Sequence, residues 1–215
     1  MLKSLQSSPR ILSLILLAGC VAGAAIDAHA DDSPPPTNWR VIATSADRER
    51  LRGWRTAWIK ALDQVAAAGQ SQQIAPLGAL MQPDAAQPGA TPPAGDYACR
   101  VFKLGSRRPA GPVVTTLPPF TCRVAQEGGI LSLTKLEGGQ KPVGLLFPQD
   151  GSRMIFLGTM MLGDERRALE YGRDPERDMI GAFERIGDQR WRLVLPYPRW
   201  ESLLDVVELV PKARG

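Results

Sequence analysis

The chain has 215 residues, 44% of them hydrophobic, so it is long enough and apolar enough to bury one core of ordinary domain size. Its formal net charge is +4, and two of the basic residues, Lys3 and Arg10, lie within residues 1–19. The remaining chain therefore carries a net charge of only +2, whereas nucleic-acid-binding domains usually present a concentrated basic face. Length and charge predict a single-domain protein that does not bind nucleic acid.

The N-terminal residues are organised like a bacterial signal peptide. A basic region precedes an apolar run, Ile11–Leu17. The stretch Leu17-Ala18-Gly19-Cys20 matches the lipobox of bacterial lipoproteins, in which the cysteine thiol receives a diacylglyceryl group before cleavage. We therefore predict a signal peptide over residues 1–19, acylation of Cys20 and a stable anchor made of several acyl chains.

A second cleavage site leaves the location of the mature protein open. Ala28-His29-Ala30 is an A-x-A site, and cleavage after Ala30 would release a soluble periplasmic protein. For cleavage at this site, the apolar core of the signal peptide would have to be unusually long and would contain several Gly and Ala residues. Val21 rather than Asp follows the lipobox cysteine, which fits sorting to the outer membrane. We expect a lipoprotein on the periplasmic side of that membrane, with residues 20–38 as a lipidated tether.

The cysteine count supports this assignment. An odd number of cysteines in an exported protein needs an explanation, and acylation of Cys20 leaves Cys99 and Cys122 as a pair. In their strand-like runs, both cysteines alternate in step with the apolar residues and so face the same side as them. This predicts an inward-facing disulfide between neighbouring strands in an oxidising compartment. The rival interpretation is a catalytic or metal-binding thiol.

Histidine usage excludes several chemistries. The only histidine, His29, lies in or beside the leader. The mature domain then lacks the base of a Ser-His-Asp mechanism and the commonest zinc ligand. We predict no metal site and no cofactor.

Residues 39–82 are predicted as a helical segment. Within it a helix from about Ala46 to Ala68, capped by Thr44 or Ser45, carries apolar residues at steps of three and four. These are Leu51, Trp54, Trp58, Leu62 and Val65. Ile74–Met81 adds a short second helix.

Three arginines, Arg48, Arg52 and Arg55, run beside the apolar stripe of the long helix. They fit an interfacial helix that meets anionic lipid, or a helix packed on the domain with a solvated basic edge. We favour the packed helix. The following Gln82–Ala94, rich in Pro, Ala and Gly, is expected to be a connector with nothing to pack.

From Gly95 onward the apolar residues alternate with polar ones, which is typical of half-buried strands. The strand-like runs are Tyr97–Leu104, Phe120–Gln126, Ile130–Leu136, Val143–Phe147, Arg153–Met161, Met179–Ile186, Trp191–Leu195 and Leu203–Val210. Glycine-containing turns separate many of them, as hairpins demand. We predict an α+β, mainly β fold: the amphipathic helix and the short second helix pack on an antiparallel meander of roughly eight strands over residues 95–211. Closure into a lipocalin-like barrel would remove the exposed sheet edges, although an open sheet or sandwich would give the same pattern.

Two connections are longer than hairpin turns, namely Gly105–Pro119 and Gly163–Arg177. Long charged loops at a barrel rim often carry function, and solvated loops have the same composition. The candidate rim-loop binding residues are Arg107, Arg108, Asp164, Glu165, Tyr171 and Arg173.

Carboxylates are the remaining catalytic option, and six of them lie between Asp164 and Asp178. Arginines interleave with them, which indicates a salt-bridged loop rather than the fixed pair across a cleft that a glycosidase needs. The spacing lacks the alternation of a calcium-binding loop. No phosphate-binding glycine loop or dinucleotide fingerprint is present in the sequence. We assign no catalytic residue.

The segment Trp39-Arg40…Asp47-Arg48…Leu51-Arg52…Trp54-Arg55…Trp58 resembles the start of a bacterial family, domain of unknown function 4893. The later motifs Cys99-Arg100, Lys103-Leu104-Gly105, Cys122-Arg123 and Leu157-Gly158-Thr159 resemble its barrel part. The resemblance covers roughly Trp39 to Pro211. It implies relatives with the same domain and assigns no reaction.

Three functions fit these observations. The first is a non-enzymatic binding module, a lipid-tethered barrel that holds a small apolar ligand or docks an envelope protein. The second is a small-barrel inhibitor of a periplasmic enzyme, acting through its N-terminal segment or a rim loop. The third is a carboxylate-dependent hydrolase that uses the Asp164–Asp178 loop. We favour the first.

Overall fold

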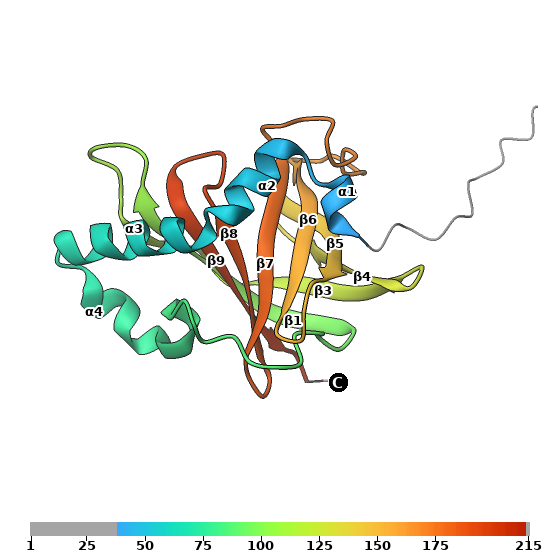
Figure 1. The fold of residues 1–215 in the computed structure, drawn as a ribbon, viewed down its shortest axis with the longest axis horizontal. Helices are drawn as coiled ribbons and strands as arrows, with labels where there is room; N and C mark the ends of the chain where they lie inside the picture. Colours follow the sequence, from blue (N-terminus) through green and yellow to red (C-terminus); the bar gives the residue numbers. More distant parts are fainter. Residues whose placement is uncertain (1–37, 214–215) are drawn as a thin grey trace, which may run out of the picture. The chain divides into compact units, whose positions relative to one another are not determined.

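Residues 38–213 are described by the structure, a computed structural model, and they form a mainly β domain (Figure 1). The predicted signal peptide, the lipidation site Cys20 and the alternative cleavage site at Ala30 lie outside the described residues. In the described part of the chain, no helix is long and apolar enough to cross a membrane.

Short helices precede the sheet. They are α1 (Trp39–Ile42), α2 (Ser45–Arg52), α3 (Trp54–Ala67), α4 (Ser71–Ile74) and the 3₁₀ helix η1 (Ala75–Met81). The Thr44 hydroxyl accepts a hydrogen bond from the backbone N–H of Asp47, so Thr44 is the cap. The prediction of one continuous helix was wrong, because α2 ends and α3 begins around Gly53. A Cβ at Gly53 would lie 3.1 Å from the Tyr197 ring, so glycine lets the bend pack closely on the barrel.

Within residues 38–213 the sheet has nine strands, which are numbered in chain order. They are β1 (Gly95–Ser106), β2 (Val114–Thr116), β3 (Phe120–Glu127), β4 (Ile130–Lys135), β5 (Gln140–Pro148), β6 (Arg153–Leu162), β7 (Asp178–Gly187), β8 (Arg190–Pro196) and β9 (Ser202–Pro211). Every pairing is antiparallel, and β1 also pairs with β9 along most of its length. The sheet is therefore a closed barrel of eight strands, which confirms the predicted fold class. The three-residue β2, which lies within a predicted loop, adds to the second half of β1.

Alternation along each strand divides the apolar residues between two sides. In β1, for example, Tyr97, Cys99 and Val101 belong to the cluster inside the barrel. Phe102 and Leu104 belong to a second cluster on the outside. Several strands are therefore apolar on both faces, because the helices cover part of the outer surface and bury the apolar side chains there.

Helices α2 and α3 lie against this outer surface (Figure 1), and their buried apolar residues pack on it. Helix α3 packs on β1, β8 and β9, and α2 packs on β7. Trp58 and Val65 are completely buried there. The long helix is thus a packed helix, as the favoured interpretation predicted.

The connector Gln82–Ala94 also packs, so the prediction that it has nothing to pack was wrong. Ala90 is buried in the barrel's inner cluster. The indole Nε1–H of Trp191 donates to the Ala90 carbonyl at 3.1 Å, and the Tyr97 hydroxyl donates to the Pro93 carbonyl at 2.5 Å. Buried Trp and Tyr need such partners for their polar atoms. The connector supplies them and covers this end of the barrel.

A buried ion pair joins the sheet to the helical layer. The side chains of Arg192 on β8 and Glu184 on β7 are both fully buried, and the Arg192 Nε–H donates to Glu184 at 2.8 Å. Arg192 also donates to the carbonyl oxygens of Ala79, Leu80, Gln82 and Pro83 at the end of η1. Its guanidinium lies 4.6 Å from the centre of the Trp58 ring. One side chain therefore satisfies both the carboxylate and the last carbonyls of the helix.

Replacing Arg192 tests this arrangement. Arg192→Met leaves the Glu184 carboxylate with a single cationic partner, Arg153, and leaves the η1 carbonyls unsatisfied. Breaking a buried pair from one side costs roughly 3–5 kcal/mol, which urea unfolding followed by circular dichroism measures. The matched variant Arg107→Met, at an exposed arginine, is expected to change stability by less than about 0.5 kcal/mol. Equal stability of the two variants would contradict the account.

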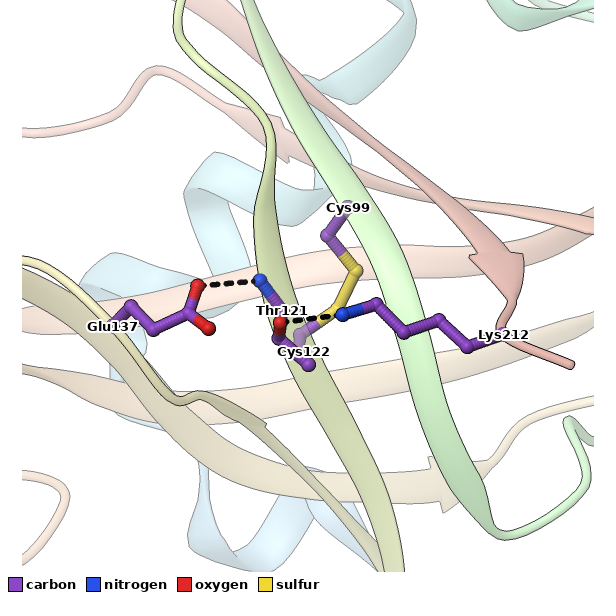
Figure 2. The surroundings of a disulfide bond; sticks show 5 residues. All are labelled: Cys99, Thr121, Cys122, Glu137 and Lys212. Carbon is purple, nitrogen blue, oxygen red and sulfur yellow. Dashed lines mark hydrogen bonds between the residues drawn. A yellow bond between two sulfur atoms is a disulfide. The ribbon is translucent and has the colours of Figure 1, made fainter. Parts of the chain in front are cut away.

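The predicted disulfide between Cys99 and Cys122 is confirmed (Figure 2). It joins β1 to β3, with a Cα–Cα distance of 6.0 Å and a sequence separation of 23. Both cysteines are buried inside the barrel. Beside them, the backbone N–H of Thr121 donates to Glu137 at 2.8 Å, and Lys212 Nζ donates to the Thr121 hydroxyl at 2.7 Å. The disulfide thus cross-links β3 to β1, the strand that pairs with β9 to close the barrel.

Removal of the disulfide is expected to lower the free energy of unfolding. For a loop of this length the chain-entropy model gives roughly 3 kcal/mol, so Cys99→Ala/Cys122→Ala should shift the urea midpoint downward. Wild type treated with reductant is the control and should match the double variant. Free thiols at both positions in unfolded, unreduced wild type would refute the bond.

Candidate functional site

The interior of the barrel is filled at one end and hollow at the other. At the connector end, the rings of Tyr97 and Trp191 pack edge to face with 6.1 Å between their centres. Phe156 and Phe183 are fully buried in the same cluster. Large aromatic side chains leave no room for a ligand at this end.

At the opposite end the interior contains a cavity of about 80 Å³. This end carries the long β6–β7 loop and the loop between β8 and β9. The apolar walls come from several strands and include Val101, Phe120, Leu133, Met179, Leu193 and Val207. Binding sites for small molecules are typically concave and mostly apolar, with a few polar groups at defined positions.

The volume limits what can enter. A water molecule takes up about 30 Å³ in the liquid, so 80 Å³ holds roughly three water-sized groups. Drug-sized ligands occupy pockets of about 300–1,000 Å³. The cavity therefore fits a ligand of a few non-hydrogen atoms, or one end of a larger molecule.

Charged side chains surround the mouth of the cavity, and the basic ones outnumber the acidic ones. The basic residues are Arg50, Lys103, Lys135, Arg177 and Arg199, and the acidic ones are Glu176, Asp178 and Asp205. Apolar walls below a basic mouth are complementary to an anion with an apolar part.

Lys103 and Asp205 face each other across the β1–β9 ladder that closes the barrel. Lys103 Nζ lies 3.3 Å from Asp205 Oδ2, and the Ser202 hydroxyl donates to Asp205 Oδ1 at 2.5 Å. Burial raises the pKa of the Asp205 carboxyl, and Lys103 and Ser202 only partly oppose this effect. Lys103 is thus held in place by a carboxylate.

Lys135 differs, because none of the described carboxylates forms an ion pair with it. Its Nζ lies 4.3 Å from the centre of the Phe120 ring. Burial lowers the pKa of Lys135, and Glu137 opposes this from a distance. A partly desolvated ammonium without a paired carboxylate is the group at the mouth best placed to gain from a bound anion.

Arg199 adds a second group of this kind. Its Nε atom is buried and has no hydrogen-bond partner among the described residues. Buried donors normally have partners, so this N–H at the mouth is a position where a ligand oxygen would be stabilised.

Helix α2 reaches the mouth through Arg50. The Arg50 Nε–H donates to Asp47 at 2.9 Å, and its Nη2 donates to the Asp178 carbonyl at 2.8 Å. The Tyr171 hydroxyl donates to Asp47 at 2.5 Å and accepts from the Thr44 N–H at 3.1 Å. Burial and Asp47 raise the pKa of Tyr171, so its hydroxyl stays protonated. These contacts fix the β6–β7 loop beside the cavity.

The six rim-loop candidates from the sequence do not converge on one site. Arg107, Arg108, Asp164 and Arg173 are exposed, and Arg173 pairs with Glu170. Glu165 pairs with Arg177 at 2.7 Å and accepts from the Leu162 N–H. Tyr171 holds the loop against α2, as described above. Within the described residues, no three His, Cys, Asp or Glu side chains are placed to hold a metal ion.

The sequence interpretation missed Lys103, Lys135, Arg199 and Asp205. The sequence pattern could have identified three of them. Lys103, for example, is the next residue in the inward-facing alternation of Cys99 and Val101. In the same way Lys135 follows Leu131 and Leu133, and Asp205 precedes Val207 and Leu209. Charged residues at the end of an inward-facing series mark the mouth of a barrel.

A family model described as domain of unknown function (DUF4893) matches residues 39–209. The chain belongs to the DUF4893 family. The match spans the helical segment and nearly all of the barrel, including the whole cavity, so the hollow barrel is part of the matched DUF4893 region. No curated protein and no solved structure matches this DUF4893 chain.

The raised pKa of Asp205 gives a pH prediction. The folded state binds this proton more tightly than the unfolded state, so the contribution of Asp205 to stability is lost as pH rises above about 4, the ordinary pKa. The stability of wild type relative to Asp205→Asn should therefore fall between pH 4 and 7, as measured by urea unfolding. Asp164→Asn, which removes an exposed carboxylate, controls for net charge. A difference that rises with pH would contradict the assignment.

Proposed function

We propose that this protein is a periplasm-facing, lipid-anchored binding protein whose barrel holds the apolar part of a small anion. The observation that carries the proposal is the cavity at one end of the barrel, with apolar walls and a basic mouth. The predicted lipobox at Cys20 supports the location. A location in the envelope would place the cavity where small organic acids and fragments of envelope polymers are encountered.

The expected ligand is a short amphipathic anion such as a carboxylate. Its apolar end would lie among Val101, Leu133 and Met179, and its charge would lie near Lys135 and Arg199. Hydrogen bonds to charged groups contribute about 1.5–3 kcal/mol each. Full-length acyl chains exceed the volume of the cavity, which narrows the earlier expectation of a small apolar ligand.

The alternative functions have less support. An inhibitor acting through its N-terminal segment needs a free face there, whereas the apolar face of α2 and α3 is buried on the barrel. A hydrolase needs two available carboxylates at a cleft. In the Asp164–Asp178 loop, Glu165 and Asp174 pair with Arg177, and Asp178 accepts a hydrogen bond from Gly172. Of this loop's carboxylates at the mouth, Glu176 alone has no such contact among the described residues.

Calorimetric titration with straight-chain carboxylates from acetate to dodecanoate tests the proposal. Affinity should peak near butanoate and hexanoate, because about three carbons fill the cavity and the rest of the molecule reaches the charged groups at its mouth. The alcohols of equal length should bind at least about tenfold more weakly, a difference of about 1.4 kcal/mol.

Lys135→Gln should weaken hexanoate binding about tenfold, because it removes the charge that has no paired carboxylate. Lys60→Gln, an equal charge change on the exposed side of α3, is the control and should bind like wild type. Absence of binding by every carboxylate at millimolar concentration, or equal binding of acids and alcohols, would reject the proposed ligand class.

A further inference from the structure

A second concave site lies on the outside of the barrel, where α1 and α2 meet the turn between β5 and β6. Its volume is about 430 Å³. It is lined mainly by two indoles and four guanidinium groups, those of Trp39, Trp54, Arg40, Arg48, Arg52 and Arg153. We call this site the Trp/Arg groove. It shares none of its lining residues with the cavity inside the barrel.

The positive charge of the Trp/Arg groove is only partly compensated. Its one lining carboxylate, Asp150, accepts hydrogen bonds from the N–H and hydroxyl of Ser152 at 2.9 and 3.0 Å. Among the described residues, no carboxylate pairs with Arg40 or Arg48. The Arg48 guanidinium donates to two backbone carbonyls, and the Arg40 guanidinium has no hydrogen-bond partner among the described residues. The charges of Arg52 and Arg153 are paired with glutamates outside the groove lining.

Three of the arginine side chains, those of Arg40, Arg48 and Arg153, contact other residues of the groove, and that of Arg40 remains exposed to solvent. The Arg40 guanidinium lies 4.5 Å from the centre of the Trp39 ring. Trp39 is itself fixed by a 2.8 Å hydrogen bond from its Nε1–H to Gln149 Oε1. Arg48 Nη1 donates to the carbonyls of Arg40 at 3.1 Å and Ala43 at 2.5 Å, and Arg153 stacks on Trp54 at 4.6 Å. Positions fixed in advance lower the entropy lost on binding.

We propose that the Trp/Arg groove binds the phosphate group of a phosphoester. Guanidinium groups donate in a planar fork that matches phosphate oxygens. A phosphate offers several acceptor oxygens, enough to bridge Arg40 and Arg48, and the indoles supply a flat apolar wall for the rest of the molecule. The proposal does not depend on the ligand of the inner cavity, because the two sites have separate linings.

Phosphoesters reach such a groove from two sources, the headgroups of membrane phospholipids and soluble phosphate esters. Three probes distinguish them: inorganic phosphate, glycerol 3-phosphate, and dihexanoyl phosphatidylglycerol below its micelle concentration. Binding is measured by calorimetry and by fluorescence, since Trp39 and Trp54 line the groove. We expect all three probes to bind, with affinity that falls as salt rises.

The variant Arg40→Gln is the central test, because this side chain is exposed and its loss leaves the fold intact. It should weaken glycerol 3-phosphate binding at least fivefold, and Arg40→Gln/Arg48→Gln at least twentyfold. Arg107→Gln/Arg108→Gln removes the same charge from an exposed loop and should leave binding unchanged. Hexanoate binding in the inner cavity should be the same in all of these proteins, which separates this proposal from the previous one.

The relative affinities identify the source. Phosphatidylglycerol binding at least tenfold tighter than glycerol 3-phosphate assigns the groove to a lipid headgroup, and equal affinities assign it to a soluble phosphoester. No phosphate binding at millimolar concentration, or binding that Arg40→Gln and the exposed-loop control weaken equally, would overturn the proposal.

Discussion

Main-chain hydrogen bonds between β1 and β9 close the sheet on itself, and the rest of the structure depends on this closure. The ladder runs from Tyr97 opposite Pro211 to Ser106 opposite Ser202. Closure removes both free edges and gives the strands an inside, so that the alternation of side chains decides which residues meet in the interior. The same ladder places Lys103 opposite Asp205 at the mouth of the cavity.

The two ends of the interior are filled differently, and this difference underlies the proposed function. Around Phe156, the facing glycines Gly144 and Gly158 provide space for an aromatic ring, and the connector satisfies the polar atoms of Tyr97 and Trp191. At the other end a cavity remains, and charged residues replace apolar ones at the ends of the inward-facing series. The cavity end is the part of the interior that the proposed function assigns to a ligand.

Period-two alternation and glycine turns were enough to predict the antiparallel meander, and cysteine parity was enough to predict the Cys99–Cys122 bond. The bend at Gly53 was not predictable, because it is set by contact with Tyr197, which is distant in sequence. The packing of the connector was missed for a similar reason, since its backbone carbonyls rather than its side chains make the contacts. The cavity depends on side-chain volumes in three dimensions, and no sequence pattern reports those. The alternation in the sequence places Lys103 and Lys135 on the inward-facing side of their strands. Their position at the mouth of a cavity follows only once the sheet is known to close into a barrel.

The central claim is that the open end of the barrel binds the apolar part of a small anion. A crystal structure of the protein with hexanoate tests this claim most directly. The account predicts the alkyl chain between Val101 and Leu133, with the carboxylate within hydrogen-bond distance of Lys135 Nζ. Hexanoate bound elsewhere, or a barrel interior that side chains fill completely at both ends, would contradict it.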